Sequence, residues 1–337
     1  MDLKNVTMKD IAKYTGVSTA TVSRVLNDNY PVNIETKKKV LKAIEELNYE
    51  PNLVAKNLRS RKSNLVAIIV ADIKNPYYVS IAKEIDDFLF EEGYNLITCS
   101  TDESLEKEAT IIRLLLSKHI DGIVIAPSDS GKSNLTGLIE QQVPIVLVDR
   151  KTNDLSIPFV GTSNFKEAYN LTEYLINKGH EKIAVLTGKL NTSTGKERLE
   201  GFKMAMANYG LVVDETWIFN GDFDEKQAYE ELSRFLKSNK DLPTALVSCN
   251  NLMTKGTILA LNEENINIPE DISIVSFGAM ENQELFTTRI TCIEQDTRFM
   301  GRKVAELLLA QLKNKQKLKS IIVESTFIEG NSVKEWN

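Results

Sequence analysis

The spacing of hydrophobic residues changes near residue 63. Before that point, apolar residues recur three and four positions apart in three short segments, which begin after Thr7, after Ser18 and at Ile34. This period predicts three amphipathic helices. Beyond it, short continuous apolar runs such as residues 65–70 alternate with longer helical segments. The pattern predicts a small helical unit followed by a large unit in which strands and helices alternate.

The large unit is typical of an α/β fold with parallel sheets. Buried parallel strands are continuous apolar runs, and strand–helix alternation favours right-handed crossovers. The rhythm runs once before and once after about residue 160, which predicts two lobes. We expect strands at 65–70, 95–99, 122–126, 145–148, 183–186, 217–220, 245–249, 272–277 and 319–327, and helices at 81–92, 105–118, 135–142, 166–178, 195–209, 225–238, 254–262 and 298–311.

The small unit has the pattern of a helix-turn-helix. Gly16 stands where the chain must turn sharply, and Thr7 and Ser18 can cap the two helices. On the third helix we expect one inward face of Val40, Leu41, Ile44 and Leu47. The second helix leaves small and polar residues on its outer face: Thr19, Ala20, Thr21, Ser23 and Arg24.

That outer face suits a DNA major groove. Small residues let the backbone approach base edges, and Arg24 can donate two hydrogen bonds to a guanine. Thr21, Ser23 and Asn27 suit phosphate oxygens, which position the module. The alternative interpretation is an ordinary surface hairpin of two helices. Residues 52–62 are short, basic and marginally helical, so they predict either a helix that forms only when held or a solvated linker.

Charge divides the chain at the same place. Residues 1–62 hold 12 Lys and Arg against 7 Asp and Glu, while the remainder holds 29 against 40. A basic head on an acidic body confines any contact with DNA to the head. The three cysteines give no disulfide framework, no apolar run approaches a membrane span, and the N-terminus is no signal peptide, so we expect a cytoplasmic protein without a membrane partner.

Enzyme motifs are weak. Gly131-Lys132-Ser133 lacks the earlier glycine of a phosphate-binding loop, because that position holds Ala126. His119 and His180 stand before predicted strands without partner groups, and no cysteine–histidine cluster has metal spacing. We therefore expect no catalytic site, no metal and no cofactor.

The segment from Thr7 to Asn27, followed by Tyr49-Glu-Pro-Asn52 and Ala55-x-x-Leu58, resembles the LacI/GalR family of bacterial transcription regulators. The resemblance implies a helix-turn-helix headpiece (1–50), a hinge helix and linker (51–63), and a two-lobed, periplasmic-binding-protein-like core (64–337). The N lobe would comprise about 64–162 and 293–322, and the C lobe about 163–292 and 323–337, with crossings near 161–163, 290–294 and 320–324.

The resemblance also implies roles for single residues. Thr19, Ala20 and Arg24 would read bases. Asn52 would begin a hinge helix that lies in the minor groove, Ala55 would let two such helices pack closely, and Leu58 would be the wedge at a central base step. It implies a homodimer on a pseudo-palindromic operator in double-stranded DNA, since one head reads only a half-site. A tetramer is not expected, because the chain lacks the C-terminal apolar heptad helix of tetrameric members.

An effector is expected between the lobes, at the carboxyl ends of strands. Tyr77 and Tyr78 follow the first strand and could stack on a ligand or pack in the lobe; the Asp149–Arg150 pair ends another strand. A loop with Thr192 and Thr194 enters the helix that carries Arg198, an arrangement that favours anions. The resemblance places Tyr78, Arg198, Phe223 and Asn250 at the ligand.

The chain departs from the family where members that sense neutral sugars or nucleobases carry aspartate. It has Gly278 instead, and also Ser163, Asn251 and Ala279. We interpret these losses as favouring an anionic effector, a sugar acid of the ketodeoxygluconate type or a sugar phosphate; drift behind the cleft is the alternative. The predicted function is a repressor of a carbohydrate-catabolic operon, released by this effector. The alternatives are a regulator whose ligand or partner strengthens DNA binding, and a sugar-binding protein without DNA.

Overall fold

The computed structural model describes residues 6–27, 30–49, 63–132, 134–153, 156–238, 241–314 and 318–336. The chain forms two compact units, Met1–Lys62 and Ser63–Asn337. Within the described residues, no helix is long and apolar enough to cross a membrane. Ser63, expected in the linker, belongs to the second unit, where its main-chain N–H donates to Asp121 over 2.9 Å.

The first unit is a three-helix domain of α1 (Met8–Thr15), α2 (Thr19–Asn27) and α3 (Ile34–Glu46). The predicted caps are confirmed: Thr7 accepts from the main chain of Asp10, and Ser18 accepts from that of Thr21. Gly16 ends α1 with φ +70°, a left-handed conformation that glycine adopts without strain.

The core of this unit lies where the helical period predicts it, with one exception. Ile11, Val22 and Val40 are fully buried. Leu41, expected inside, is 47% exposed, whereas Ala43 is buried in its place. On a helix of 3.6 residues per turn, positions 40, 43, 44 and 47 share one face more closely than position 41 does.

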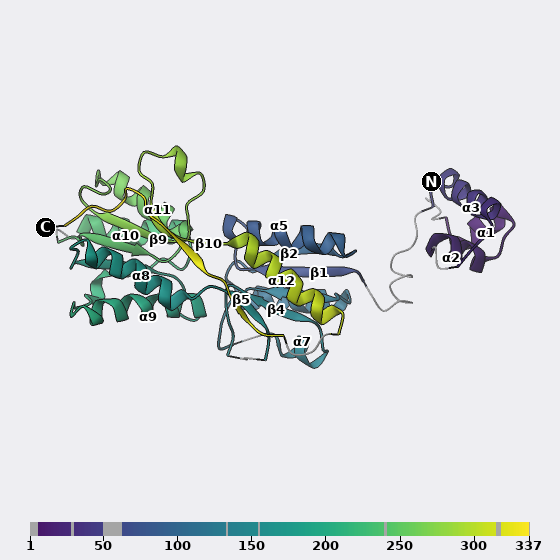
Figure 1. Ribbon diagram of the computed structural model, residues 1–337, viewed down its shortest axis with the longest axis horizontal. Coiled ribbons are helices and arrows are strands. Elements are labelled where there is room, and N and C mark those ends of the chain that lie inside the picture. The colour runs from purple at the N-terminus through teal and green to yellow at the C-terminus, as the bar shows by residue number, and fades with distance from the viewer. Residues whose placement is uncertain are drawn as a thin grey trace. The chain divides into compact units, whose positions relative to one another are not determined.

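The second unit contains two parallel α/β lobes (Figure 1). The N lobe has a sheet in the order β11-β5-β4-β3-β1-β2. The helices α5 and α12 cover one face of this sheet, and α6 and α7 contribute apolar side chains to the other. Its elements are β1 (Leu65–Val70), α5 (Pro76–Glu91), β2 (Asn95–Ser100), α6 (Leu105–Ser117), β3 (Gly122–Ile125), α7 (Thr136–Glu140), β4 (Ile145–Val148), β5 (Phe159–Gly161), α12 (Thr297–Leu312) and β11 (Ile321–Ile322).

The C lobe repeats the plan with the order β12-β10-β9-β8-β6-β7. Only the β10–β12 pair is antiparallel among its described pairings. The α8–α9 and α10–α11 pairs lie on opposite faces (Figure 1). Its elements are α8 (Asn164–Asn177), β6 (Ile183–Thr187), α9 (Ser193–Asn208), β7 (Ile218–Asn220), α10 (Glu225–Ser238), β8 (Ala245–Ser248), α11 (Asn251–Glu263), β9 (Ser273–Phe277), β10 (Thr291–Gln295) and β12 (Ser325–Ile328).

The crossings between lobes differ in detail from the prediction. They lie at 162–163, at 296 and at 323–324, because β10 continues in the C-lobe sheet as far as Gln295. Residues 293–295, expected in the N lobe, are therefore part of the C lobe. The predicted strand 319–327 is two short strands in different sheets, and β5 and β10 were not predicted. Helix α5 begins at Pro76, since Asn75 caps it and proline suits the first turn.

Candidate functional site

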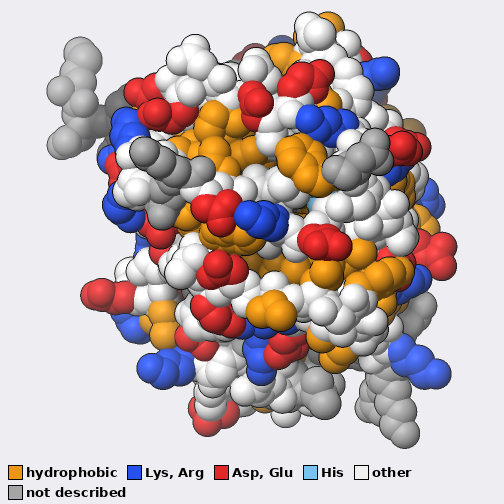
Figure 2. Space-filling model, turned by 90° about the vertical axis from the view of Figure 1, so that its left-hand side faces the viewer, with side chains coloured by type: hydrophobic (Ala, Val, Ile, Leu, Met, Phe, Trp, Pro, Cys, Tyr) orange, Lys and Arg blue, Asp and Glu red, His pale blue; other side chains and the backbone are white. Residues whose placement is uncertain are grey.

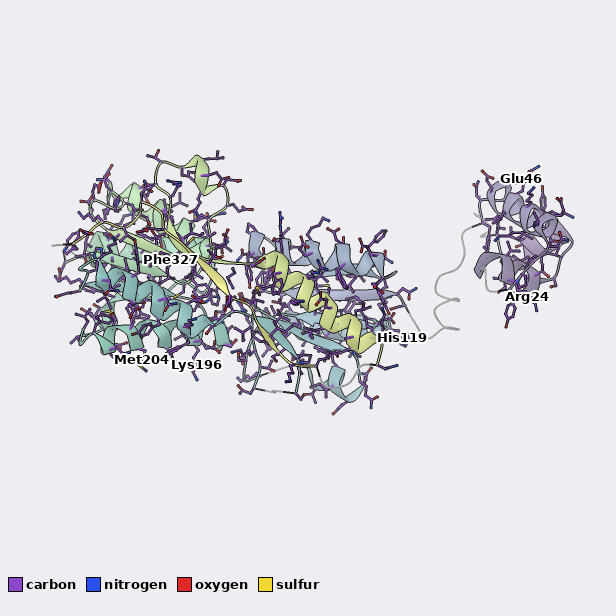
Figure 3. The ribbon with its side chains drawn as sticks, in the orientation of Figure 1. Arg24, Glu46, His119, Lys196, Met204 and Phe327 are labelled. Atoms are coloured by element: carbon purple, nitrogen blue, oxygen red, sulfur yellow. The ribbon has the colours of Figure 1, made fainter. Side chains whose placement is uncertain are left out.

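The outer face of α2 presents the residues predicted to read DNA. Thr19, Ala20 and Arg24 are exposed, while Thr21 and Ser23 are half-buried. The Thr21 hydroxyl lies 2.9 Å from that of Ser18, so it also serves the helix cap. Figure 3 shows the Arg24 side chain projecting away from the three-helix body. The Asn27 side chain, and Asn52, Ala55 and Leu58, lie outside the described residues.

Arg24 has an aromatic neighbour on the same unit. Its guanidinium lies 5.6 Å from the ring centre of Tyr30, which is 68% exposed. A cation–π contact at an exposed site is weak, so it guides the guanidinium without holding it.

The face at the C-lobe end of the core carries acidic, basic and hydrophobic side chains mixed together (Figure 2). Such mixed charge is typical of a solvated surface.

A cavity of about 420 Å³ opens between the carboxyl ends of the two sheets. In each sheet the strand order reverses there, between β1 and β3 and between β6 and β8, which is where α/β folds bind ligands. The volume lies within the range of roughly 300–1,000 Å³ seen for ligand pockets. The predicted ligand residues that line it are Tyr77, Tyr78, Asp149, Arg150, Thr194, Arg198, Phe223, Asn250 and Gly278.

Both tyrosines are tied to one carboxylate. The Tyr77 hydroxyl donates to Asp149 Oδ1 over 3.0 Å, and the Tyr78 hydroxyl donates to Asp149 Oδ2 over 2.8 Å. Burial, and then the Asp149 charge, raise the pKa of Tyr77 well above its usual value; burial also raises the pKa of Tyr78. Asp149 therefore faces the cavity with both of its oxygens already accepting hydrogen bonds from neutral phenols.

Arg150 is not available in the way the sequence suggested. Its Nη1 and Nη2 donate to the two oxygens of Glu103 over 2.7 and 2.6 Å, a two-point ion pair with little exposure. Burial acts to lower the pKa of Arg150, but Tyr78, Glu103 and Asp149 outweigh it and raise the pKa. The charge of Arg150 is thus compensated by a residue of the same lobe.

Arg198 is the other buried guanidinium, and its partners are neutral. Its Nε donates to Asn164 Oδ1 over 2.8 Å and its Nη1 donates to the Cys249 carbonyl over 2.5 Å. The group lies 3.6 Å above the Phe277 ring. No ion pair to Arg198 is formed within the described part of the chain, and burial lowers its pKa although the Asp149 charge opposes this. A cation in this state can accept an anionic partner.

The remaining predicted residues shape the cavity. Asn250 caps α11 and donates to the Phe223 carbonyl over 3.3 Å, which holds the aromatic ring beside the cavity. Gly278 lines the wall with φ +95°. Thr192 is not among the lining residues: its hydroxyl caps α9 by accepting from the Gly195 N–H and donates to the Lys189 carbonyl over 2.7 Å.

Sequence reasoning missed several groups that the fold brings to the cavity. Neither Glu103 nor Asn75 belongs to a motif that predicts ligand binding. Asn75 Oδ1 nevertheless accepts a hydrogen bond from the Asn251 side chain of the other lobe over 3.1 Å. Gln295 donates to both the Tyr77 hydroxyl and Thr162, at 3.2 and 3.1 Å. Gln295 ends β10 and Glu103 lies in the loop that follows β2, so a search of every strand end would have found these two; Asn75 stands at the cap of α5. Among the described residues, no cluster of His, Cys, Asp and Glu could hold a metal ion.

The two units and the interlobe cavity together define a DNA-binding regulator with a ligand-binding core. Family models agree: residues 7–52 match "Bacterial regulatory proteins, lacI family", and residues 63–330 match "Periplasmic binding proteins and sugar binding domain of LacI family". The chain belongs to the LacI family, and it is a transcriptional repressor with a helix-turn-helix and a ligand-binding domain.

Individual relatives agree over nearly the whole chain. The "HTH-type transcriptional repressor PurR" of Pasteurella multocida is 33% identical over 94% of this chain and 95% of its own length. The lac repressor dimer bound to operator and the anti-inducer ONPF superposes with a TM-score of 0.85 at 25% identity, over 98% of this chain and all of that one. The CelR–cellobiose complex gives a TM-score of 0.72 at 26% identity, over 97% and 99%.

Proposed function

We propose that this repressor controls a carbohydrate-catabolic operon and is released from its operator by an anionic sugar derivative, a six-carbon sugar acid, bound between the lobes. The observation that carries the proposal is Arg198, a buried guanidinium at the cavity whose described partners are all neutral. A carboxylate that replaces water there forms a charge-assisted hydrogen bond in a site of low dielectric. Gly278, Asn251 and Ala279 line the same wall and present no carboxylate to repel it.

The headpiece and the hinge act on DNA in this repressor. Two copies of the head, carried by a homodimer, read the halves of a pseudo-palindromic operator in the cytoplasm, with Arg24 at a base edge. Asn52, Ala55 and Leu58 act in a hinge helix in the minor groove. The similarity to a lac repressor that was solved as a dimer on its operator supports this arrangement.

The test uses three six-carbon polyols that differ only in their carboxylates: glucitol with none, gluconate with one and glucarate with two. Calorimetric titration of the full chain should show gluconate binding at least tenfold more tightly than glucitol, as expected for one charge-assisted contact. Arg198→Met should abolish that preference because it removes the cation, whereas Arg198→Lys should retain part of it. Equal or tighter binding of glucitol, or no binding of the series, contradicts the proposed ligand class.

Operator binding gives the direction of control. In a gel shift with the full chain, gluconate should weaken the complex of the wild type and leave that of Arg198→Met unchanged, because linkage requires the ligand to bind the two states differently. A ligand that strengthens the complex would instead establish the co-repressor alternative.

A further inference from the structure

The two arginines at the cavity differ in one feature, the partner that each one has. Arg150 makes its two-point ion pair with Glu103, at 2.7 and 2.6 Å, and the two side chains are only 3% and 13% exposed. Arg198 donates to an amide and a carbonyl. Both guanidiniums lie beside the same ring, with Phe223 at 5.1 Å from Arg150 and 6.0 Å from Arg198. The cavity therefore holds two cations, of which Glu103 compensates one.

Arg150 retains unused donor capacity next to the cavity. Its Nε is buried and finds no hydrogen-bond acceptor among the described residues, and it stands 3.9 Å from Asp149 Oδ2. Asp149 is in turn occupied by Tyr77 and Tyr78. Releasing Arg150 from Glu103 would free two further N–H groups, which together form the planar fork that binds a carboxylate or phosphate at two points.

The carboxylates of the inner cavity lie against Arg150. Glu103 pairs with it at two points and Asp149 Oδ2 stands 3.9 Å from its Nε, whereas Arg198 forms no ion pair with a described residue. The other charged residues in the described lining are all acidic and are partly or fully exposed to solvent: Asp72, Glu281, Glu284 and Glu294. A ligand with one anionic group can place it at Arg198. A second anionic group finds no uncompensated cation in the lining and meets carboxylates instead, at a cost that low dielectric increases.

From this arrangement of charges we propose that Glu103 determines ligand specificity by restricting the cavity to ligands with a single negative charge. It does so by neutralising Arg150. The inference rests on the proposed function, since it assumes an anion at Arg198. It specifies the class of ligand: the cavity accepts monocarboxylate sugar acids and excludes dicarboxylate sugar acids and phosphate esters.

The experiment compares glucitol, gluconate and glucarate by calorimetry on three full-length variants. Wild type should prefer gluconate to glucarate. Glu103→Gln removes one charge but keeps the side-chain shape, so the preference should shift toward glucarate by roughly tenfold or more, as expected when one buried cation becomes uncompensated. Glu103→Gln/Arg150→Gln removes both charges and should restore the wild-type order. Asp102→Asn is the matched control, because Asp102 is the preceding residue, pairs with Lys107 and is 63% exposed.

The outcomes separate the two proposals. If wild type binds glucitol as tightly as gluconate, the proposed function fails. If wild type prefers gluconate but the ratio is the same in Glu103→Gln, or if the double variant keeps the shifted ratio, the role of Glu103 is overturned while the proposed function stands. Because Glu103→Gln leaves Arg150 buried without its partner, its thermal melt is recorded first. If it does not fold, the double variant must still match wild type, and a glucarate preference there refutes the inference.

Discussion

The DNA-binding face and the ligand cavity use arginine in opposite settings. Arg24 stands exposed on a helix, and its neighbour among the described residues is the aromatic ring of Tyr30. Arg150 and Arg198 are 2% and 5% exposed and depend on partners for their charge to be tolerated. The charge and the hydrogen-bond donors of an exposed arginine are available to its target. For a buried arginine, partners far away in the sequence determine which donors are free and whether the charge is compensated.

The two regions also differ in how they are stabilised. The head is a three-helix unit with a small apolar core, and small domains have little stability in reserve. The core buries continuous apolar strands in both lobes and can support charged groups inside. Truncating one buried side chain in the head should therefore impair function more than truncating one buried side chain in either lobe.

The largest effect is expected from Ile11→Ala. Ile11 is fully buried in the head, and the loss of its side chain costs about 2–5 kcal/mol, which is comparable to the whole stability of such a unit. Operator binding, measured by fluorescence anisotropy, should be lost while ligand affinity is unchanged. The matched control is Leu41→Ala on α3, where the side chain is 47% exposed. Operator binding by Ile11→Ala at wild-type affinity would show that the head is stabilised by something other than this core.

The second effect lies in the core. Arg150→Met leaves Glu103 buried without a cation, which costs about 3–5 kcal/mol and lowers the urea midpoint of the core. Its neighbour Lys151 forms an ion pair with Glu197 that is 36% and 26% exposed, so Lys151→Met should change stability by about 1 kcal/mol or less. Similar losses for the two variants would mean that burial does not distinguish these pairs.

This contrast explains which parts were predictable. The helix period, the caps at Thr7 and Ser18, and the turn at Gly16 are local properties, so the head could be read from about twenty residues. Most strands of the core were predicted because buried parallel strands are continuous apolar runs. The strands β5 and β10 were missed, since neither is a long apolar run and both are defined by their neighbours in the sheet.

The sequence indicated part of the cavity lining but not the pairing of its charges. All the predicted effector residues except Thr192 line the cavity, and the family resemblance supplied Arg198, but much of the lining was not predicted. The pairing of Arg150 with Glu103 joins residues 47 positions apart, from loops after two strands that are not adjacent in the sheet, and no local pattern reports it. Thr192 was predicted at the ligand but is not among the lining residues, because its hydroxyl caps α9.

A smaller effect is expected at Arg24. Arg24→Ala should cost about 1–3 kcal/mol of operator affinity and relax the preference at one base pair. Arg24→Lys keeps the charge but not the planar fork, so it should retain the salt dependence of binding and lose the discrimination. Both are measured against duplexes selected for tight binding and their single-base variants. Unchanged discrimination in Arg24→Lys would reduce Arg24 to a phosphate contact.

The smallest effect separates the two regions by pH. Both histidines lie in the core, and His180 is fully buried, with Nδ1 at 2.9 Å from the Thr244 hydroxyl. Burial lowers the pKa of His180 below its usual 6.5, although a main-chain contact to Lys334 opposes this. The folded core then binds fewer protons than the unfolded chain, so its stability is complete above about pH 6.5 and declines as the pH falls through that value toward the folded pKa.

Tryptophan fluorescence reports this decline for the core alone, because Trp217 and Trp336 both lie in the second unit. The urea midpoint of wild type should decrease when the pH is lowered from 7.5 to 5.5. The midpoint of His180→Gln should decrease less, because glutamine does not take up a proton. The midpoint of the head, followed by operator binding, lacks a histidine contribution over the same range. An equal fall in His180→Gln and wild type would assign the pH dependence to groups other than His180.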